Sequence, residues 1–362
     1  MSHIYAVIMA GGVGSRFWPR SRERTPKQLI EIFGSGTMIQ NTVNRIQSLV
    51  PAMNTFVVTN KLQEEAIYRQ LPFLPKENIL VEPVGRNTAP CIGLAALWIK
   101  QIDPEGVLVV LPADHIIEKP DEFLRIVQLA AKVANETDSL LTIGIKPTHP
   151  ETGYGYIQFD DEAHSHNPFH KDGVYRVKTF AEKPNVETAQ KFLQSGDFLW
   201  NSGMFVWKAG SILKEIQVHM PDLHEQLVAL EQKLRTPSYQ MALEHAYGII
   251  RSISIDYGIM EKAGNVFVVN GDFGWSDVGS WDEVFRLTKT DAEGNAVKGH
   301  ALLKDAKANY IDGGNKFVGV VGVENLIIIS TDDAILVCKR GRSQDVKEIV
   351  DYLRRKQMND YL

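Results

Sequence analysis

Short apolar runs alternate with amphipathic stretches through the first 145 residues of the chain. Five runs are rich in β-branched residues and have the length of strands buried on both faces, namely 4–10, 56–59, 79–81, 107–111 and 140–145. Between them, segments 61–70 and 120–135 carry apolar residues at helical spacing. This alternation predicts an α/β fold, with a Rossmann-like, mostly parallel sheet flanked by helices.

The pattern changes after residue 148. Segments 154–159 and 174–181 alternate in the manner of antiparallel strands. The polar segment between them contains His164, His166 and His170. Because no paired or helical ligand spacing organises these histidines, we expect a solvated hairpin loop there rather than a metal site.

A second change, near residues 288–299, divides the chain into two predicted domains, 1–288 and 289–362. The second begins with short strand-like pieces at 301–303, 317–323 and 326–330, which predict a small β module. Helical spacing over 342–358 predicts a terminal helix with Ser343 as its N-cap and one apolar face, formed by Val346, Ile349, Val350 and Leu353. This part is too small to fold alone, so we expect it to pack on the first domain and to help form a homodimer.

Composition excludes several classes of function. The net charge is −5 and the sequence pI is about 6.1, so no bulk positive field attracts nucleic acid or an anionic membrane. No apolar run approaches the roughly 20 residues that span a bilayer. The two cysteines, Cys91 and Cys338, have no metal or redox spacing and suggest reduced thiols in a cytoplasmic protein.

The first candidate chemistry follows the first apolar run, where Gly11, Gly12 and Gly14 precede Arg16 and Lys27. Glycines after a strand let backbone N–H groups approach an anion. Arg16 is suited to bidentate phosphate binding, and Lys27 to the role of a mobile point charge. A tight turn without a ligand is the alternative. The dinucleotide and P-loop patterns do not match, since the third glycine and the Gly-Lys-Ser/Thr element are missing.

Residues 82–90 read EPVGRNTAP and follow a predicted strand, where α/β sheets bind ligands. Glu82 is placed to accept hydrogen bonds from guanine N1–H and its amino group, and Arg86 to donate to guanine O6. Asn87 and Thr88 are candidates for base or ribose contacts. They are equally suited to capping the next helix.

Two carboxylates stand in tight segments far apart in the chain. Asp114 ends a buried run in LPADH, and Asp277 lies in GWSDVGSW. Each residue alone suits either a turn cap or a magnesium ligand, since magnesium takes few carboxylates and keeps phosphate and water ligands.

Three further motifs suit a sugar phosphate, although each is unremarkable alone. TGYGYI places Gly155 where backbone can approach a sugar ring, FAEKP offers Glu182 and Lys183, and LWNSGMF offers Asn201. The acidic residues of IDYGIMEK, at 255–262, are second-rank candidates.

Together these segments resemble the sugar-phosphate nucleotidyltransferases. The signature G-G-x-G-[ST]-R…P-K matches from Gly11 to Lys27 and includes Ser15, while E-P-x-G-R-N-T-A-P is typical of the mannose-1-phosphate guanylyltransferase branch. The resemblance covers essentially the whole chain. It implies the nucleotide-diphospho-sugar transferase fold with a short left-handed β-helix. The implied reaction converts GTP and mannose 1-phosphate into GDP-mannose and pyrophosphate, with Mg²⁺ as cofactor.

The resemblance also implies roles for the matching residues. Gly11, Gly12, Gly14 and Ser15 would bind nucleotide together with the EPVGRNTAP residues. Arg16 and Lys27 would hold the triphosphate, and Lys183 the sugar phosphate. Asp114 and Asp277 would bind the metal, and the sugar would contact Gly155, Glu182 and Asn201.

The match has departures and alternatives. Phe17, Trp18 and Arg20 replace residues common in relatives, and no isomerase domain follows, so isomerase activity is not expected. Transfer to a heptose 1-phosphate, or from a thymidine nucleotide to glucose 1-phosphate, remains open. So does a non-catalytic regulatory homologue, although the intact charged residues argue against it.

Overall fold

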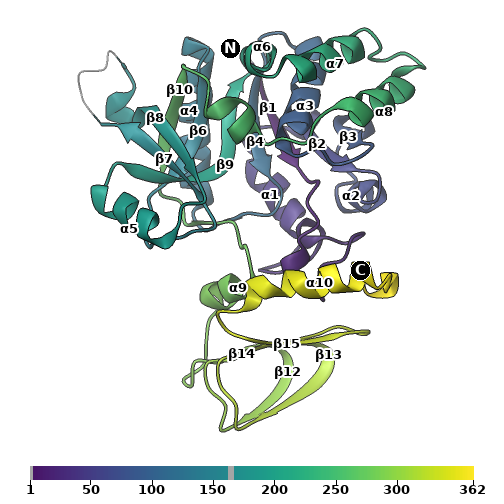
Figure 1. The fold of residues 1–362 in the computed structure, drawn as a ribbon, viewed down its shortest axis with the longest axis vertical. Coiled ribbons are helices and arrows are strands. Elements are labelled where there is room, and N and C mark those ends of the chain that lie inside the picture. Colours follow the sequence, from purple (N-terminus) through teal and green to yellow (C-terminus); the bar gives the residue numbers. More distant parts are fainter. Residues whose placement is uncertain (1–2, 162–166) are drawn as a thin grey trace.

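The computed structural model describes residues 3–161 and 167–362. A nine-stranded sheet forms its centre, in the order β3-β2-β1-β4-β9-β6-β10-β8-β7 (Figure 1). The strands are β1 (Ile4–Met9), β2 (Thr55–Asn60), β3 (Ile79–Glu82), β4 (Val107–Pro112), β6 (Leu140–Ile145), β7 (Gly155–Asp160), β8 (Val174–Glu182), β9 (Phe198–Lys208) and β10 (Val266–Gly271). The β3-β2-β1-β4 half and the β6–β10 pair are parallel. β7, β8 and β9 pair antiparallel with their neighbours, which confirms the predicted change after residue 148.

Helices cover both faces of the sheet. The helices of the described residues are α1 (Met38–Ile46), α2 (Glu64–Gln70), α3 (Thr88–Ile102), α4 (Pro120–Thr137), α5 (Val186–Ser195), α6 (Ala209–His219), α7 (Pro221–Glu231), α8 (Tyr239–Ile249), α9 (Trp281–Leu287) and α10 (Val346–Arg355). Of these, α9 and α10 lie at the C-terminal strands rather than on the sheet (Figure 1). Ala6 and Ile8 of β1 pack into the core beneath α1 and α4, whereas Tyr5 and Val7 pack against α3 and α6–α8. Burial of successive residues on opposite faces explains the unbroken apolar run.

Of two predicted helices, one is confirmed and the other begins later than predicted. The helix over 120–135 is confirmed and extends to Thr137. The helix predicted over 61–70 begins only at Glu64, because the Asn60 side chain accepts hydrogen bonds from the N–H groups of Leu62 and Gln63 and forms a turn first. Of the three histidines in the polar segment, His164 and His166 lie outside the described residues, and His170 starts a 3-10 turn.

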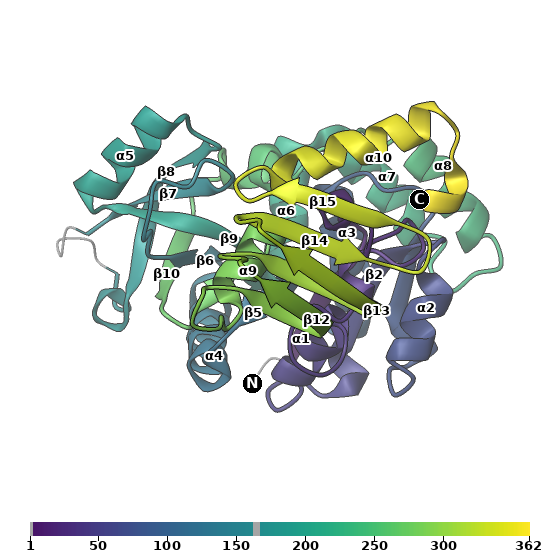
Figure 2. The same cartoon turned by 90° about the horizontal axis from the view of Figure 1, so that it is seen from below.

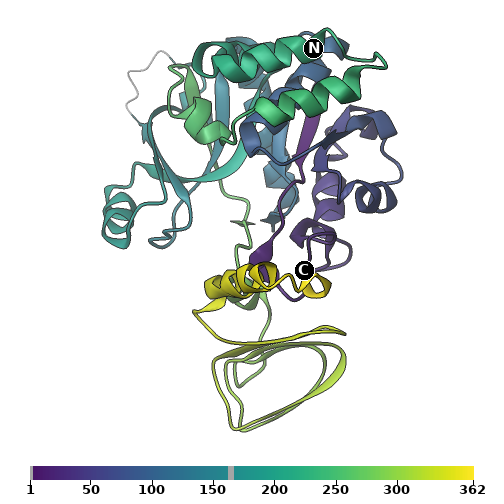
Figure 3. The ribbon, with the colours of Figure 1, turned by 45° about the vertical axis from the view of Figure 1, so that its right-hand side comes forward.

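The C-terminal strands wind into a small β-helical unit below the main sheet, which is called the coil from here on (Figures 1 and 3). It contains β12 (Ala296–Lys304), β13 (Tyr310–Val321), β14 (Leu326–Ser330) and β15 (Ile335–Lys339). β12, β13 and β14 pair in parallel, and β15 pairs antiparallel with β14 (Figure 2). Helix α10 then runs across the top of the coil, between it and the main domain (Figure 1).

Two predictions about the terminal helix, its N-cap and one residue of its buried face, are wrong. Ser343 is not its N-cap, because the Ser343 hydroxyl bonds the Asp282 carboxylate and a 3-10 turn over Ser343–Asp345 precedes α10. Val346, Val350 and Leu353 are buried as predicted, but Ile349 is exposed. No helix in residues 3–161 and 167–362 combines the length and apolar content that crossing a membrane requires.

Candidate functional site

Two cavities lie at the carboxyl ends of β1, β3 and β4 and contain most of the predicted site residues. The larger cavity has a volume of about 480 Å³ and the smaller about 350 Å³. Asp277 and His115 line both, so the two cavities meet at these side chains. The glycine-rich loop serves both as well, with Gly11 and Gly12 at the larger cavity and Gly14, Ser15 and Arg16 at the smaller.

A short pairing explains why Asp114 and Asp277 share the smaller cavity. Strand β5 (Ile116–Ile117) pairs antiparallel with β11 (Trp275–Ser276), and Ser276 lies opposite Ile116. The residues just outside this pair, Asp114 on one side and Asp277 on the other, are thereby brought to one place. The predicted proximity of the two aspartates is thus present in the structure.

Lys27 joins these two segments. Its ammonium lies 2.9 Å from the Asp114 carboxylate and also donates to the Asp277 main-chain oxygen. The Lys27 residue is only 4% exposed, so the expected mobile charge is wrong: this lysine is fixed. Burial alone would raise the pKa of Asp114, but Lys27 and His115 hold that pKa below its usual value.

Gly14 is required for this arrangement. Its φ is 62°, and a Cβ atom there would lie 2.6 Å from the Lys27 Cβ. A side chain at position 14 would therefore both strain the backbone and displace Lys27. The glycine lets the loop and the lysine pack directly together at the smaller cavity.

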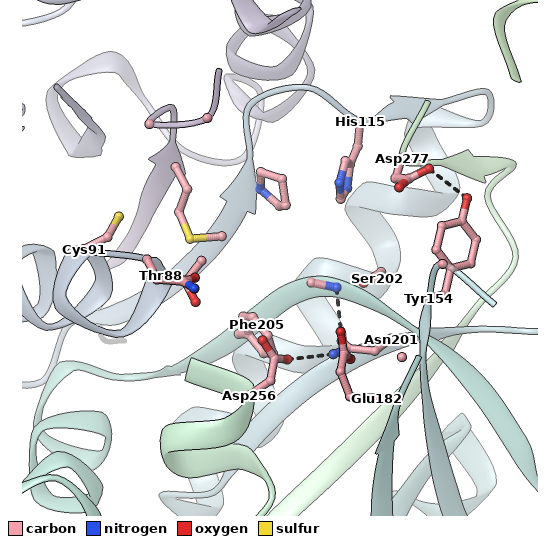
Figure 4. A pocket seen from close by; sticks show the side chains of 18 of the residues that line it. Thr88, Cys91, His115, Tyr154, Glu182, Asn201, Ser202, Phe205, Asp256 and Asp277 are labelled. Atoms are coloured by element: carbon pink, nitrogen blue, oxygen red, sulfur yellow. Dashed lines mark hydrogen bonds between the residues drawn. The ribbon is translucent and has the colours of Figure 1, made fainter. Parts of the chain in front are cut away.

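His115 and Tyr154 surround Asp277 where the cavities meet (Figure 4). The Tyr154 hydroxyl donates to the Asp277 carboxylate over 2.8 Å. Burial, followed by the nearby carboxylate, raises the pKa of Tyr154, so this phenol stays a donor. Burial lowers the pKa of His115 to about 4, and Trp275 donates to its Nδ1 over 3.1 Å. A neutral imidazole protonated on Nε2 follows from these contacts.

One end of the larger cavity holds the EPVGRNTAP residues. Glu82 is 3% exposed and accepts a hydrogen bond from the Tyr247 hydroxyl at 3.0 Å. Burial raises the pKa of Glu82 to about 7, against the opposing effect of that bond. Asn87 caps α3 by accepting from the Thr88 N–H, and both residues also line the cavity, so capping and ligand contact are compatible.

The other end holds Glu182, Asn201 and Asp256 (Figure 4), and Gly155 also lines the cavity. Gly155 pairs with Glu182 across β7 and β8, and a Cβ on Gly155 would lie 2.4 Å from the Glu182 carboxylate. The Asn201 amide donates to Asp256 over 2.7 Å. Burial raises the pKa of Asp256, partly offset by Asn201. Several hydrogen-bonding groups therefore converge on this end, as a sugar ring requires.

Two predicted residues lie outside these cavities. Neither Arg86 nor Lys183 is among the described residues that line them. Arg86 Nε donates to the Tyr247 carbonyl, and Lys183 Nζ lies 2.8 Å from Glu182 with 65% of its side chain exposed. Each lies beside a residue that does line the larger cavity, so a ligand contact would require a side-chain movement.

Sequence reasoning also missed residues that line the cavities. His115 and Trp275 lie in quoted motifs but received no role, and Asp256 was ranked second. Adjacency to Asp114 and Asp277 is a signal that singles out His115 and Trp275. Lys347 of α10 lines the smaller cavity, and nothing in its local sequence indicates this.

Comparisons with known proteins agree with this geometry. The nucleotidyl transferase family model matches residues 5–294, and the MannoseP isomerase/GMP-like beta-helix domain model matches residues 299–353. A mannose-1-phosphate guanylyltransferase of Klebsiella pneumoniae is 41% identical, over 98% of this chain and 75% of its own length. One from Escherichia coli (strain K12) is 39% identical, over 98% and 74%.

A solved structure shares both parts of the fold. The Thermus thermophilus protein, described as a mannose-1-phosphate geranyltransferase, superposes with a TM-score of 0.86 at 31% identity. The match covers 97% of this chain and 99% of that one, which confirms the predicted α/β domain with a β-helix. The chain therefore belongs to the nucleotidyl transferase family and, within it, to the mannose-1-phosphate guanylyltransferases.

Proposed function

We propose that this protein transfers GMP from GTP to α-D-mannose 1-phosphate, giving GDP-mannose and pyrophosphate. The observation that carries the proposal is the junction of the two cavities at Asp277 and His115, with cations in one and hydrogen-bonding groups in the other. Guanine is assigned to the Glu82 end of the larger cavity, and mannose to the Asn201 end. The GTP phosphates are assigned to the smaller cavity.

The reaction at the junction is an in-line displacement. An oxygen of the mannose 1-phosphate forms a bond to the α-phosphorus, and the bond from that phosphorus to the β-phosphate oxygen breaks. The attacking phosphate is already ionised, so no general base is needed. Such transfers depend on positioning and charge stabilisation. Arg16 and the N–H groups of the glycine loop supply both at the smaller cavity, and His115, which lines both cavities, offers its Nε2–H as a further donor.

Lys27 acts mainly by holding the site together. Its ammonium is engaged by Asp114 and by the Asp277 carbonyl, so it fixes both metal-ligand candidates while lending positive charge to the triphosphate. Lys183 is placed to reach the sugar phosphate once it leaves Glu182, since most of its side chain is exposed.

We propose Mg²⁺ as the cofactor, held by Asp114 and Asp277. The fit rests on the donor set: the carboxylates of Asp114 and Asp277 line the smaller cavity, and no group of three or more His, Cys, Asp or Glu that could by itself hold a metal ion occurs within the described ranges. Such a set leaves most ligand positions to phosphate and water, which is typical of magnesium. When bound, the ion neutralises charge on the phosphates.

The test is a matrix of four nucleoside triphosphates against several sugar 1-phosphates, measured as pyrophosphate release. We expect GTP with mannose 1-phosphate to give the highest kcat/KM. A heptose 1-phosphate preferred over mannose 1-phosphate, or dTTP over GTP, would replace this proposal by one of the two alternatives. No turnover with any pair would indicate a binding protein.

We also propose a homodimer in the cytoplasm. Several apolar side chains of the coil are exposed, among them Leu302, Phe317, Val321, Ile335 and Val337. Several exposed apolar side chains on one small unit are typical of an interaction surface. Light scattering should give twice the chain mass, and Phe317→Asp should give a monomer. A monomeric wild-type protein would contradict the proposal.

A further inference from the structure

One residue of the smaller cavity comes from the C-terminal helix. The cavity is otherwise lined by the loop after β1, Lys27 and the residues around Asp114 and Asp277, and Lys347 of α10 completes it. Lys347 lies 331 positions after Arg16 in the chain (347 − 16), yet the two cations line one cavity.

Helix α10 is fixed at this position by apolar packing. Val346 and Val350 are 2% and 4% exposed and belong to one core cluster with Phe17 and Val278. Phe17 follows Arg16 in the loop, and Val278 follows Asp277. The residues flanking the cavity on both sides are thus packed against the helix that carries Lys347, so its backbone cannot move away without opening this core.

Polar contacts fix the same interface. The Trp18 indole N–H donates to the Tyr361 carbonyl over 2.9 Å, and Arg20 Nε donates to Asp312 over 3.1 Å. On the outer side, Arg354 of α10 lies 3.1 Å from Glu23. The stretch that follows the glycine-rich loop is therefore bonded to the coil and to the C-terminal residues at several points, among them Arg22 to Asp333.

The charges of the smaller cavity are unevenly matched. Asp114 neutralises Lys27 at 2.9 Å. Within residues 3–161 and 167–362, no hydrogen bond or ion pair engages the side chain of Lys347, and the residue is exposed. Three cationic side chains, Arg16, Lys27 and Lys347, and two carboxylates line this concave site, so the uncommitted ammonium is suited to a polyanion.

We propose that Lys347 binds the β- and γ-phosphates of GTP and the pyrophosphate that leaves; this rests on the function proposed above. Asp277 and His115 line both cavities and mark the position of the α-phosphate, whereas Lys347 lines only the smaller one. The C-terminal helix thus contributes a substrate-binding residue, and the coil that follows the catalytic domain holds it in place.

The test compares three variants of the full chain. Lys347→Ala removes the charge at an exposed helix position, where alanine favours the helix. Arg355→Ala is the matched control, because Arg355 is exposed on the same helix and lines neither cavity. Lys347→Arg keeps the charge.

We expect Lys347→Ala to raise KM for GTP, and for pyrophosphate in the reverse reaction, by about 10-fold, as for loss of one charge-assisted contact. KM for mannose 1-phosphate should stay within about 2-fold, because that substrate lies in the larger cavity. Lys347→Arg should recover most of the affinity, and Arg355→Ala should match wild type. Calorimetric binding of inorganic pyrophosphate should show the same order.

Lys347→Ala indistinguishable from Arg355→Ala in both KM and pyrophosphate binding would overturn the inference and leave the proposed function intact. An equal rise in KM for both substrates would also overturn it, since that indicates a general structural effect. Failure of the wild type to turn over any substrate pair would instead refute the proposed function.

Discussion

The smaller and the larger cavity differ in the partners of their buried carboxyl groups and in the direction of the pKa shifts. In the smaller cavity, a lysine lies against Asp114 and keeps its pKa low, so the carboxylate is charged throughout the physiological range. In the larger cavity, Glu82 and Asp256 are bonded to a phenol and an amide, and burial raises the pKa of both. Full charges suit phosphates and a cation, whereas hydrogen-bonding groups without a matched cation suit the neutral edges of a base and a sugar.

The two cavities also differ in their construction. The larger one is built from the ends of strands β1, β3, β4, β7 and β8 and from β9 and the start of α3. The smaller one is built from loops and from α10, and therefore depends on the C-terminal coil. Under the assignment proposed above, base and sugar selection would belong to the sheet, while phosphate binding would be shared between both parts of the chain.

The largest expected effect concerns base selection in the larger cavity. A site that pairs with the polar edge of guanine can reject a nucleotide lacking those groups by as much as ~10⁴-fold. We expect kcat/KM for GTP to exceed that for ATP and UTP by a factor approaching this value. Glu82→Gln should reduce the preference, and Glu118→Gln, outside both cavities, should not. Equal kcat/KM for ATP and GTP would break the assignment of this cavity to guanine.

The two aspartates test the smaller cavity. We expect Asp114→Asn and Asp277→Asn each to lower kcat by at least ~10²-fold, the scale of losing one transition-state electrostatic group. The exposed Asp272→Asn is the control, and folding should survive in all three. The measurement is pyrophosphate release against magnesium concentration. Near wild-type turnover of both variants at low millimolar magnesium would show that the metal site lies elsewhere.

The link between the smaller cavity and the coil can be broken at Asp312. This residue is buried and accepts from Arg20, which follows the glycine-rich loop. Asp312→Asn should lower the free energy of unfolding by about 2 kcal/mol, as for loss of a hydrogen bond to a charged group. Asp305→Asn, exposed on the same coil, is the control. Denaturant unfolding is the measurement, and equal midpoints for the two variants would contradict a structural role for the pair.

The smallest effect concerns pH and the larger cavity. The pKa of Glu82 is about 7, raised by burial, and the ionised carboxylate is the form that accepts from guanine. Binding is therefore strongest above pH 7 and weakens as the pH falls through 7, by about 10-fold between about pH 8 and pH 6. Guanosine measured by calorimetry avoids titration of the phosphates. A flat profile for wild type would contradict the assignment, whereas Glu82→Gln should be weak at every pH.

Much of the fold could be predicted from the sequence because the local spacing of apolar residues specifies most of the strands and helices. The strands of the α/β half and the helix over 120–135 follow directly from residue periodicity, and the structure extends that helix to Thr137. The boundaries at Glu64 and Val346 could not be predicted, because the Asn60 side chain accepts from the N–H groups of Leu62 and Gln63, and the Ser343 hydroxyl bonds Asp282, a residue far away in the chain. Ile349 is exposed because only Val346, Val350 and Leu353 of the predicted apolar face of α10 are buried against the rest of the protein.

The departures from the family pattern just after the glycine-rich loop have a structural explanation. Phe17 and Trp18 are buried in the core that joins the loop to α10, and Arg20 bonds Asp312 of β13. These substitutions therefore concern attachment of the coil rather than chemistry. In the sequence they appear only as a local difference, since their partners lie far away in the chain.

The sequence by itself determined the residue types: the glycine loop, the two aspartates, the EPVGRNTAP segment and the periodicity of the strands. Those properties are local, because the chain's spacing fixes which residues share a face or follow a strand. The tertiary structure decided which charges meet. Pairing of β5 with β11 placed Asp114 beside Asp277, burial fixed Lys27 between their segments, and packing of α10 on Phe17 placed Lys347 at the same cavity. Contacts between residues so distant in the chain depend on the fold as a whole, and no local pattern contains them.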